Sequence, residues 1–177
     1  RRYDKSSNEL YNSAYYLNAN GTVEQIYDKK HLVPFGEFVP FNNFLNIFVE
    51  TGVENNGITG FSVGKRTNEI VIDNFTKISL FICYESIFSN EVDSSIINSD
   101  LIVHLTNDAW FGSYNGPQQH IIQMRARAIE QGLPVLRSAN TGISALIDPY
   151  GKILKKIPLN VEGYLDVHIP QKIDETL

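Results

Sequence analysis

The segment over residues 77–97 constrains the fold of this 177-residue chain more than any other. Residues 77–83 are apolar on both faces of an extended segment, which is typical of an interior strand. This strand ends at Cys83, the single cysteine of the chain. A helix with one buried stripe is then indicated by apolar residues at a spacing of four, namely Phe88, Val92 and Ile96. The order strand, cysteine, helix predicts an α/β fold.

Cys83 has two interpretations in this position. A tight turn between a strand and a helix exposes a side chain beside the positive end of the helix dipole, where a thiolate is favoured over a thiol. Ligands also bind at such turns in open α/β sheets. Alternatively, a lone cysteine in a strand is an inert small hydrophobe. Its position alone therefore leaves Cys83 as either a nucleophile or a core residue.

Length and composition exclude several classes of protein. A hydrophobic content of 42% with 20% charged residues is ordinary for a folded domain, and the length suits one domain over residues 1–177. A net charge of -5 gives no basic footprint for nucleic acid. One cysteine excludes an internal disulfide framework. Because apolar runs fall short of a membrane helix and residues 1–4 do not open a signal peptide, we expect the chain as given to be soluble.

The N-terminal third predicts a hairpin followed by irregular segments. Strand-like runs at 13–17 and 22–27 flank Asn20-Gly21, and the second run leads to Lys29. Residues 32–41, LVPFGEFVPF, combine helix-breaking Pro and Gly with apolar side chains, Phe35 among them, so we expect a loop pinned against the core. One or two helical turns are expected at 42–49. Residues 50–66 then form a long surface loop, either a lid or a tolerated insertion.

The remainder alternates strands with one long helix. Buried strands are expected at 69–72 and 101–105, and residues 106–112 form either a pocket wall or a capped turn with its aromatics packed inside. A helix should begin at Pro117 and end at Gly132. Its apolar face includes Ile122 and Ile129 and also Arg125, which we expect to pair with a buried carboxylate or with strand-end carbonyls. The segments PVLRSAN, GISALIDPYG, KILKKIPLN and EGYLDVHI predict strands and turns of an antiparallel meander, and hence a mixed sheet.

Several familiar site patterns are absent from the sequence. It contains no G-x-S-x-G elbow, no G-x-x-x-x-G-K phosphate loop and no G-x-G-x-x-G. The four histidines show no close metal-ligand spacing, so we expect no metal and no cofactor. A thiol with a pKa near 8.5 needs a base or a cation to act as a nucleophile. Lys29 is a candidate cation that would also stabilise an oxyanion, unless it is a solvated surface lysine.

Five blocks in order carry a resemblance to a known family. They are KKHLVPFGE at 29–37, CYE at 83–85, NDAWFG at 107–112, GPQQH at 116–120 and the segment 125–142. Together they resemble the nitrilase superfamily of carbon-nitrogen hydrolases and, more narrowly, its bacterial apolipoprotein N-acyltransferase branch. The resemblance implies an α/β fold of the nitrilase-like αββα sandwich type with mixed sheets and a Glu-Lys-Cys triad.

The resemblance also implies roles for particular residues. Cys83 would be the nucleophile and Lys29 the triad lysine. Supporting positions would be Glu37, Tyr84 and Glu85, and the acyl entrance would be lined by Trp110 and Phe111. The implied reaction moves an acyl chain from a phospholipid to the cysteine as a thioester, and then to the N-terminal amine of a lipoprotein's lipidated cysteine. The implied location is the bacterial inner membrane, with this domain on its periplasmic side.

The family pattern is incomplete in this chain. The resemblance puts the triad glutamate well upstream of the lysine, yet only 28 residues precede Lys29, and neither Glu9 nor Glu24 is a credible substitute. The membrane segments of the family are also missing. We therefore expect a piece of a longer protein that lacks the N-terminal part of the domain and is inactive alone. Two alternatives stay open, namely a soluble nitrilase-like amidase and a non-catalytic remnant.

Overall fold

The computed structural model describes residues 1–38, 60–72, 76–89, 92 and 98–173. The chain divides into two compact units, Arg1–Arg66 and Thr67–Leu177. The helical turns expected at 42–49, most of the loop expected at 50–66 and most of the helix expected after Cys83 lie outside the described residues. In the part of the chain that is described, no helix combines the length and hydrophobicity required to cross a bilayer.

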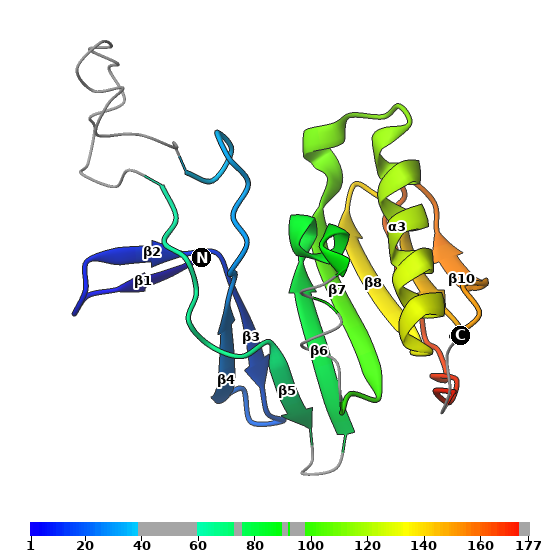
Figure 1. Cartoon of the computed structure of the whole chain (residues 1–177), viewed down its shortest axis with the longest axis horizontal. Helices are drawn as coiled ribbons and strands as arrows, with labels where there is room; N and C mark the ends of the chain where they lie inside the picture. Colours follow the sequence, from blue (N-terminus) through cyan, green and yellow to red (C-terminus); the bar gives the residue numbers. More distant parts are fainter. Residues whose placement is uncertain (39–59, 73–75, 90–91, 93–97, 174–177) are drawn as a thin grey trace. The chain divides into compact units, whose positions relative to one another are not determined.

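The first unit consists of two antiparallel strand pairs (Figure 1). Strand β1 (Arg2–Asp4) pairs with β2 (Glu9–Tyr11), and β3 (Ser13–Leu17) pairs with β4 (Val23–Asp28). The second pair is the predicted hairpin, and Gly21 in its turn has a φ of 77° that suits glycine. Burial increases toward the end of β4, where Tyr27 and Asp28 are buried. The hairpin therefore delivers Lys29 into a protected environment.

The second unit is built on a six-stranded mixed sheet with the order β10-β9-β8-β7-β6-β5. The strands are β5 (Glu69–Ile72), β6 (Thr76–Ile82), β7 (Leu101–Asn107), β8 (Val135–Asn140), β9 (Ser144–Ile147) and β10 (Ile153–Ile157). Strands β6, β7 and β8 are parallel to one another, and the remaining neighbours pair antiparallel. Strand β6 lies inside the sheet and is buried from Ile78 to Ile82, as its apolar pattern predicts. The mixed sheet and the meander of β8, β9 and β10 are also confirmed.

Helix α3 (Gly116–Gln131) packs on one face of this sheet (Figure 1). Pro117 stands in its first turn, and Gly132 ends it in the left-handed conformation, as predicted. Met124 and Ala128 of the helix belong to one buried cluster with sheet residues that include Phe81 and Ile102. Removing this apolar surface from water stabilises the unit by about 25 cal/mol per Å².

Three expectations about burial are wrong. Ile122 and Ile129 are 55% and 51% exposed, because only a narrow stripe of α3 faces the sheet. Arg125 is exposed for the same reason, although its Nε still donates to a carbonyl, that of Gly151 in the β9–β10 turn, at 2.6 Å. Phe35 is 76% exposed rather than pinned against a core. A further correction concerns residues 162–169, which are irregular and not a strand.

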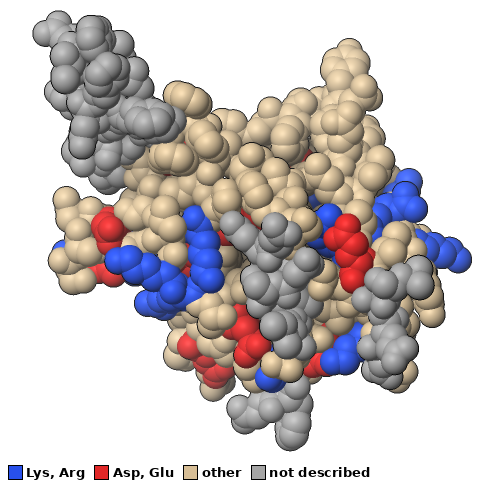
Figure 2. All heavy atoms as spheres, viewed as in Figure 1, with Lys and Arg blue, Asp and Glu red and all other residues tan. Residues whose placement is uncertain are grey.

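Figure 2 shows one face of the molecule, on which acidic side chains lie beside basic ones. Among the described residues, Arg2 pairs with Asp4 at 3.1 Å and Lys172 pairs with Asp100 at 2.7 Å. Over the whole chain 20 acidic residues stand against 15 Lys and Arg residues, which gives the net charge of -5.

Candidate functional site

Cys83 follows β6 directly and begins a short 3-10 helix, η1 (Cys83–Ile87). Its φ is 53°, a left-handed conformation that few residues other than glycine adopt. The thiol is free and only partly buried. Because β6, β7 and β8 run parallel, their carboxyl ends share one edge of the sheet, and Cys83 lies at that edge. Ligands bind at this edge in open α/β sheets.

The 3-10 helix after Cys83 is anchored by its own side chains. Glu85 is buried, and its carboxylate accepts the Ile82 N–H at 2.8 Å, which ties the helix back to the end of β6. The Ser86 hydroxyl donates to the Cys83 carbonyl at 3.1 Å. Tyr84 packs edge-on against the ring of Phe88, with centroids 5.1 Å apart. Tyr84 and Glu85, the predicted supporting residues, thus lie in the turn that directly follows Cys83.

A buried polar network lies behind Cys83 on the α3 side of the sheet. Arg137 of β8 is its centre: Nη2 donates to Asp108 Oδ2 at 2.5 Å, Nη1 lies 2.7 Å from His104 Nδ1, and Nε donates to the Ile143 carbonyl at 3.1 Å. His120 of α3 donates from Nδ1 to Asp108 Oδ1 at 2.9 Å. His104 of β7 in turn places Nε2 3.0 Å from the Cys83 carbonyl oxygen. The network thus ends at the backbone of the candidate nucleophile.

Electrostatics fix the charge states inside this network. Burial alone would raise the pKa of Asp108, but the hydrogen bond from His120 and the charge of Arg137 outweigh it, so the pKa lies below its usual value. For His104, burial and the neighbouring Arg137 charge hold the pKa well below 6.5. The ion pair is therefore charged and the His104 ring neutral at neutral pH.

Sequence reasoning did not identify this network. His104 and Arg137 each follow a run of apolar residues within a strand segment, LIVHLTN and PVLRSAN, and that position was the available signal. An isolated polar side chain at an inward strand position needs a buried partner. The buried guanidinium that we expected at Arg125 is present at Arg137 instead.

The two candidate acyl-entrance residues lie just beyond β7. They belong to the 3-10 helix η2 (Asp108–Phe111), which is capped because the Asn107 side chain accepts the Ala109 N–H at 3.2 Å. Trp110 is 74% exposed and Phe111 45% exposed. Residues 106–112 were expected to form either a pocket wall or a capped turn with its aromatics packed inside. The cap is present, but the two aromatic side chains are not packed inside. Both project from the end of β7, the strand next to the one that ends at Cys83.

In the first unit, Lys29 and Glu37 form an ion pair at 2.6 Å. The lysine is 1% exposed, so the alternative of a solvated surface lysine is wrong. The same Glu37 oxygen accepts the Val33 N–H at 2.8 Å, and the other accepts the Asn12 side-chain amide at 2.7 Å. These bonds hold the carboxylate in one orientation against the ammonium.

The structure therefore brings together two groups of predicted site residues. Lys29 and Glu37 meet in the first unit. In the second unit, Tyr84 and Glu85 directly follow Cys83. Strand β7, which leads to Trp110 and Phe111, ends at the same edge of the sheet. Because Lys29 and Cys83 belong to different units, their convergence stays a prediction.

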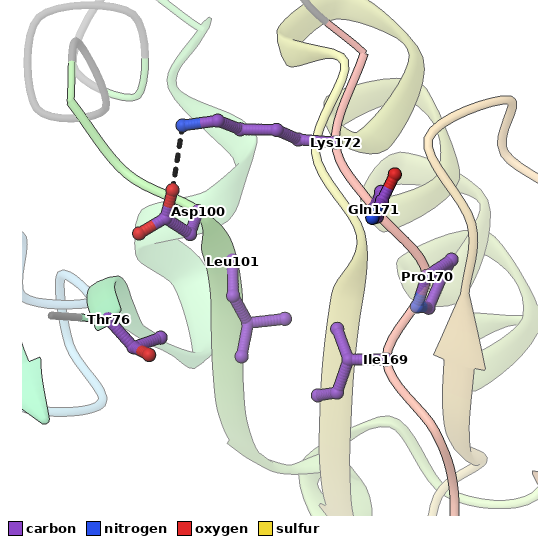
Figure 3. Close-up of a pocket in the computed structure, with 7 residues that line it drawn as sticks. All are labelled: Thr76, Asp100, Leu101, Ile169, Pro170, Gln171 and Lys172. Carbon is purple, nitrogen blue, oxygen red and sulfur yellow. Dashed lines mark hydrogen bonds and ion pairs between the residues drawn. The ribbon is translucent and has the colours of Figure 1, made fainter. Parts of the chain in front are cut away.

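A pocket on the second unit lies away from this edge (Figure 3). It is lined by Thr76, Asp100, Leu101, Ile169, Pro170, Gln171 and Lys172. Thr76 and Leu101 begin β6 and β7, so the pocket is at the amino ends of the strands, opposite Cys83. Among the described residues, no group of three or more His, Cys, Asp or Glu side chains is arranged to hold a metal ion.

Comparisons with known proteins show the family of the chain. Residues 1–176 match the family model described as carbon-nitrogen hydrolase. A protein of Rhizobium rhizogenes named apolipoprotein N-acyltransferase is 46% identical over 157 residues, which cover 88% of this chain. One of the same name from Rhodopseudomonas palustris is 44% identical over 170 residues, or 94% of this chain. The chain spans only 29% and 31% of the length of these two relatives.

A solved structure supports the fold. Nit3 of Saccharomyces cerevisiae, a member of branch 10 of the nitrilase superfamily, matches with a TM-score of 0.66 at 19% identity. The match covers 90% of this chain and 53% of Nit3. This likeness confirms the predicted nitrilase-like fold.

Proposed function

Since the chain belongs to the carbon-nitrogen hydrolase family, we propose that it supplies the nucleophile of an N-acyltransferase, with Cys83 as the residue that becomes acylated. The family relationship supports a cysteine-dependent reaction at a carbonyl. Relatives named apolipoprotein N-acyltransferase, 46% and 44% identical over most of this chain, favour acyl transfer to an amine over hydrolysis. The proposed donor is a phospholipid and the proposed acceptor the N-terminal amine of a lipoprotein.

The observation that supports this proposal most is the conformation of Cys83. A partly accessible thiol stands on a left-handed residue at the carboxyl edge of a parallel strand trio. A strained backbone persists only where its surroundings enforce it, and such strain is concentrated at functional sites. A cysteine that served only to fill the core would require neither the strain nor the edge position.

The proposed reaction proceeds in two covalent steps. The Cys83 thiolate attacks the ester carbonyl of the phospholipid, an S–C bond forms and the ester C–O bond breaks. The thiol proton passes to a carboxylate base, the glutamate that the nitrilase resemblance implies, and then to the departing lysophospholipid oxygen. The acceptor amine next attacks the thioester, an N–C bond replaces the S–C bond, and the amine proton returns to the thiolate. Such a relay predicts ping-pong kinetics.

Lys29 and Glu37 have complementary roles in this proposal. The Lys29 ammonium would stabilise the oxyanion of each tetrahedral intermediate, an effect commonly worth about 3 to 4 kcal/mol per donor. Its ion pair with Glu37 at 2.6 Å holds the ammonium in one orientation. Tyr84 and Glu85 would hold the nucleophile turn.

The lipid partner accounts for the exposed aromatics in this proposal. Trp110 and Phe111 would line the entrance for the acyl chain, because large apolar side chains gain most when they cover hydrocarbon. The proposed setting is the periplasmic side of the bacterial inner membrane, where the acyl donor and the acceptor both lie.

The experiment is thioester formation by the full-length protein from phospholipid vesicles with a labelled acyl chain. Cys83→Ser should abolish the thioester, and Lys29→Ala should slow its formation by about 10²-fold or more without unfolding the protein. Lys30→Ala is the matched control, because Lys30 is the neighbouring lysine and is exposed. Undiminished acylation in the Cys83→Ser variant would remove Cys83 from the mechanism.

A further inference from the structure

We propose that His104 is a positioning residue for the nucleophile, with its neutral ring donating from Nε2 to the Cys83 carbonyl and so fixing the backbone that presents the thiol. This inference rests on the proposed function, since it takes Cys83 as the acylated residue. None of the five blocks that carry the family resemblance includes His104, which lies inside β7 and is fully buried.

The contacts of His104 determine its tautomer. Arg137 Nη1 lies 2.7 Å from His104 Nδ1. A guanidinium nitrogen can only donate, so Nδ1 must accept, and the single ring proton is on Nε2. That nitrogen lies 3.0 Å from the Cys83 carbonyl oxygen, to which it donates. The arginine therefore selects the one tautomer that can bind the nucleophile's carbonyl.

The Cys83 backbone needs this support because of its φ of 53°. A left-handed conformation is disfavoured about 5- to 30-fold for a residue with a side chain. Each of the two hydrogen bonds to the Cys83 carbonyl, one from His104 and one from Ser86, favours the left-handed conformation about two- to tenfold. The two effects are of similar size, so the loss of one bond is enough to repopulate other conformations of the turn.

The network holds His104 from several elements at once. The charged and titratable groups around its ring are Arg137 of β8, Asp108 of η2, His120 of α3 and Cys83 itself. Asp108 fixes Arg137, and Thr106 and His120 fix Asp108. Because the peptide group is planar, fixing the Cys83 carbonyl also fixes the plane of the Cys83–Tyr84 peptide. Since the β6 ladder holds the chain up to Ile82, the direction in which the Cα–Cβ bond of Cys83 leaves the backbone is thereby restricted.

Two amide substitutions separate the contact that His104 makes through Nδ1, with Arg137, from those that it makes through Nε2, with the Cys83 carbonyl and with the Ser86 hydroxyl at 3.4 Å. In His104→Gln the side-chain amide reaches the position of Nε2, so a donor to Cys83 is kept and the contact with Arg137 is lost. In His104→Asn the amide lies near the position of Nδ1, so an acceptor for Arg137 is kept and the contact with Cys83 is lost. A role in positioning the nucleophile predicts that the Asn variant is the more impaired of the two. A merely structural role, in which the ring serves to satisfy buried Arg137, predicts the reverse.

The measurements are kcat and KM for thioester formation from phospholipid vesicles and the rate of Cys83 alkylation by iodoacetamide between pH 6 and 9. We expect His104→Asn to lower kcat about tenfold with KM unchanged and to alter the pH profile of alkylation. His104→Gln should stay within about threefold of the wild type. Met124→Ala, which removes a fully buried side chain of the α3 core, is the control for lost stability and should leave kcat unchanged.

Each outcome decides between the alternatives. A His104→Asn variant with wild-type kcat and alkylation, or a His104→Gln variant impaired as much as His104→Asn, would overturn the inference. If the wild type forms no thioester, the proposed function fails. Alkylation of Cys83 in the same variants then still decides whether His104 positions this thiol.

Discussion

Substitution of Arg137 by methionine tests how the second unit is stabilised. The side chains of Arg137 and Asp108 are both 0% exposed and form an ion pair at 2.5 Å. Methionine fills much of the same volume but leaves the carboxylate buried with no cation. Breaking a buried pair in this way typically costs about 3 to 5 kcal/mol. His104 Nδ1 also loses its hydrogen-bond donor. An unsatisfied buried acceptor typically costs about 1 to 3 kcal/mol, and part of this cost adds to the loss of the ion pair.

The expected loss in the free energy of unfolding is therefore about 3 to 5 kcal/mol, since coupled contacts do not add fully. Urea unfolding of the full-length protein at pH 7, followed by far-UV circular dichroism, measures it, provided that the m-value is unchanged. The control is Lys172→Met, which removes an ion pair with Asp100 in which both side chains are exposed, 41% and 39%. That change should cost no more than about 1 kcal/mol. A loss for Arg137→Met below about 1 kcal/mol would refute the reasoning.

Two further predictions concern the same network. The unfolding free energy should fall below about pH 6.5, because the unfolded chain binds a proton at His104 while burial and Arg137 hold the pKa of the folded ring well below that value. Glutamine does not titrate, so in His104→Gln the pH dependence of the unfolding free energy between pH 6 and 5 should be weaker by up to about 1.4 kcal/mol per pH unit. Urea midpoints at each pH measure this dependence. An unaltered dependence would contradict a neutral His104 ring in the folded protein. Gly142→Ala should cost about 1 to 3 kcal/mol, because its Cβ would overlap the Asp108 carboxylate. In Gly163→Ala the Cβ has only ordinary contacts, so equal thermal midpoints for the two variants would contradict this account.

The sequence predicted those parts of the fold whose signals are local. The interior strand β6 follows from its alternating apolar side chains, and the β3–β4 hairpin follows from Asn20-Gly21. Helix α3 begins and ends where Pro117 and Gly132 predicted. Each of these features depends on residues within a few positions of one another, and local backbone preferences determine them.

The candidate site was predictable only in part, because its contacts join distant positions. The sequence indicated Cys83 at a strand end and Lys29 after a hairpin, but it did not indicate that Lys29 is buried against Glu37. Arg137 and His104 are 33 positions apart and meet only because β7 and β8 pair in parallel. Periodicity instead assigned the buried guanidinium to Arg125, since it could not tell how much of α3 the sheet would cover. Sheet pairing, and not helix periodicity, determines which arginine is buried.

In the proposed mechanism, the left-handed backbone of Cys83 implies that the fold and the reaction favour different residues at this position. Glycine adopts such a φ without steric cost, so selection for folding alone would replace the cysteine. Folding would be easier if position 83 had no side chain. A thiol at this position is therefore a compromise between stability and activity at a single residue. For protein engineering, the most stable form of this unit and its most reactive form would then be different sequences.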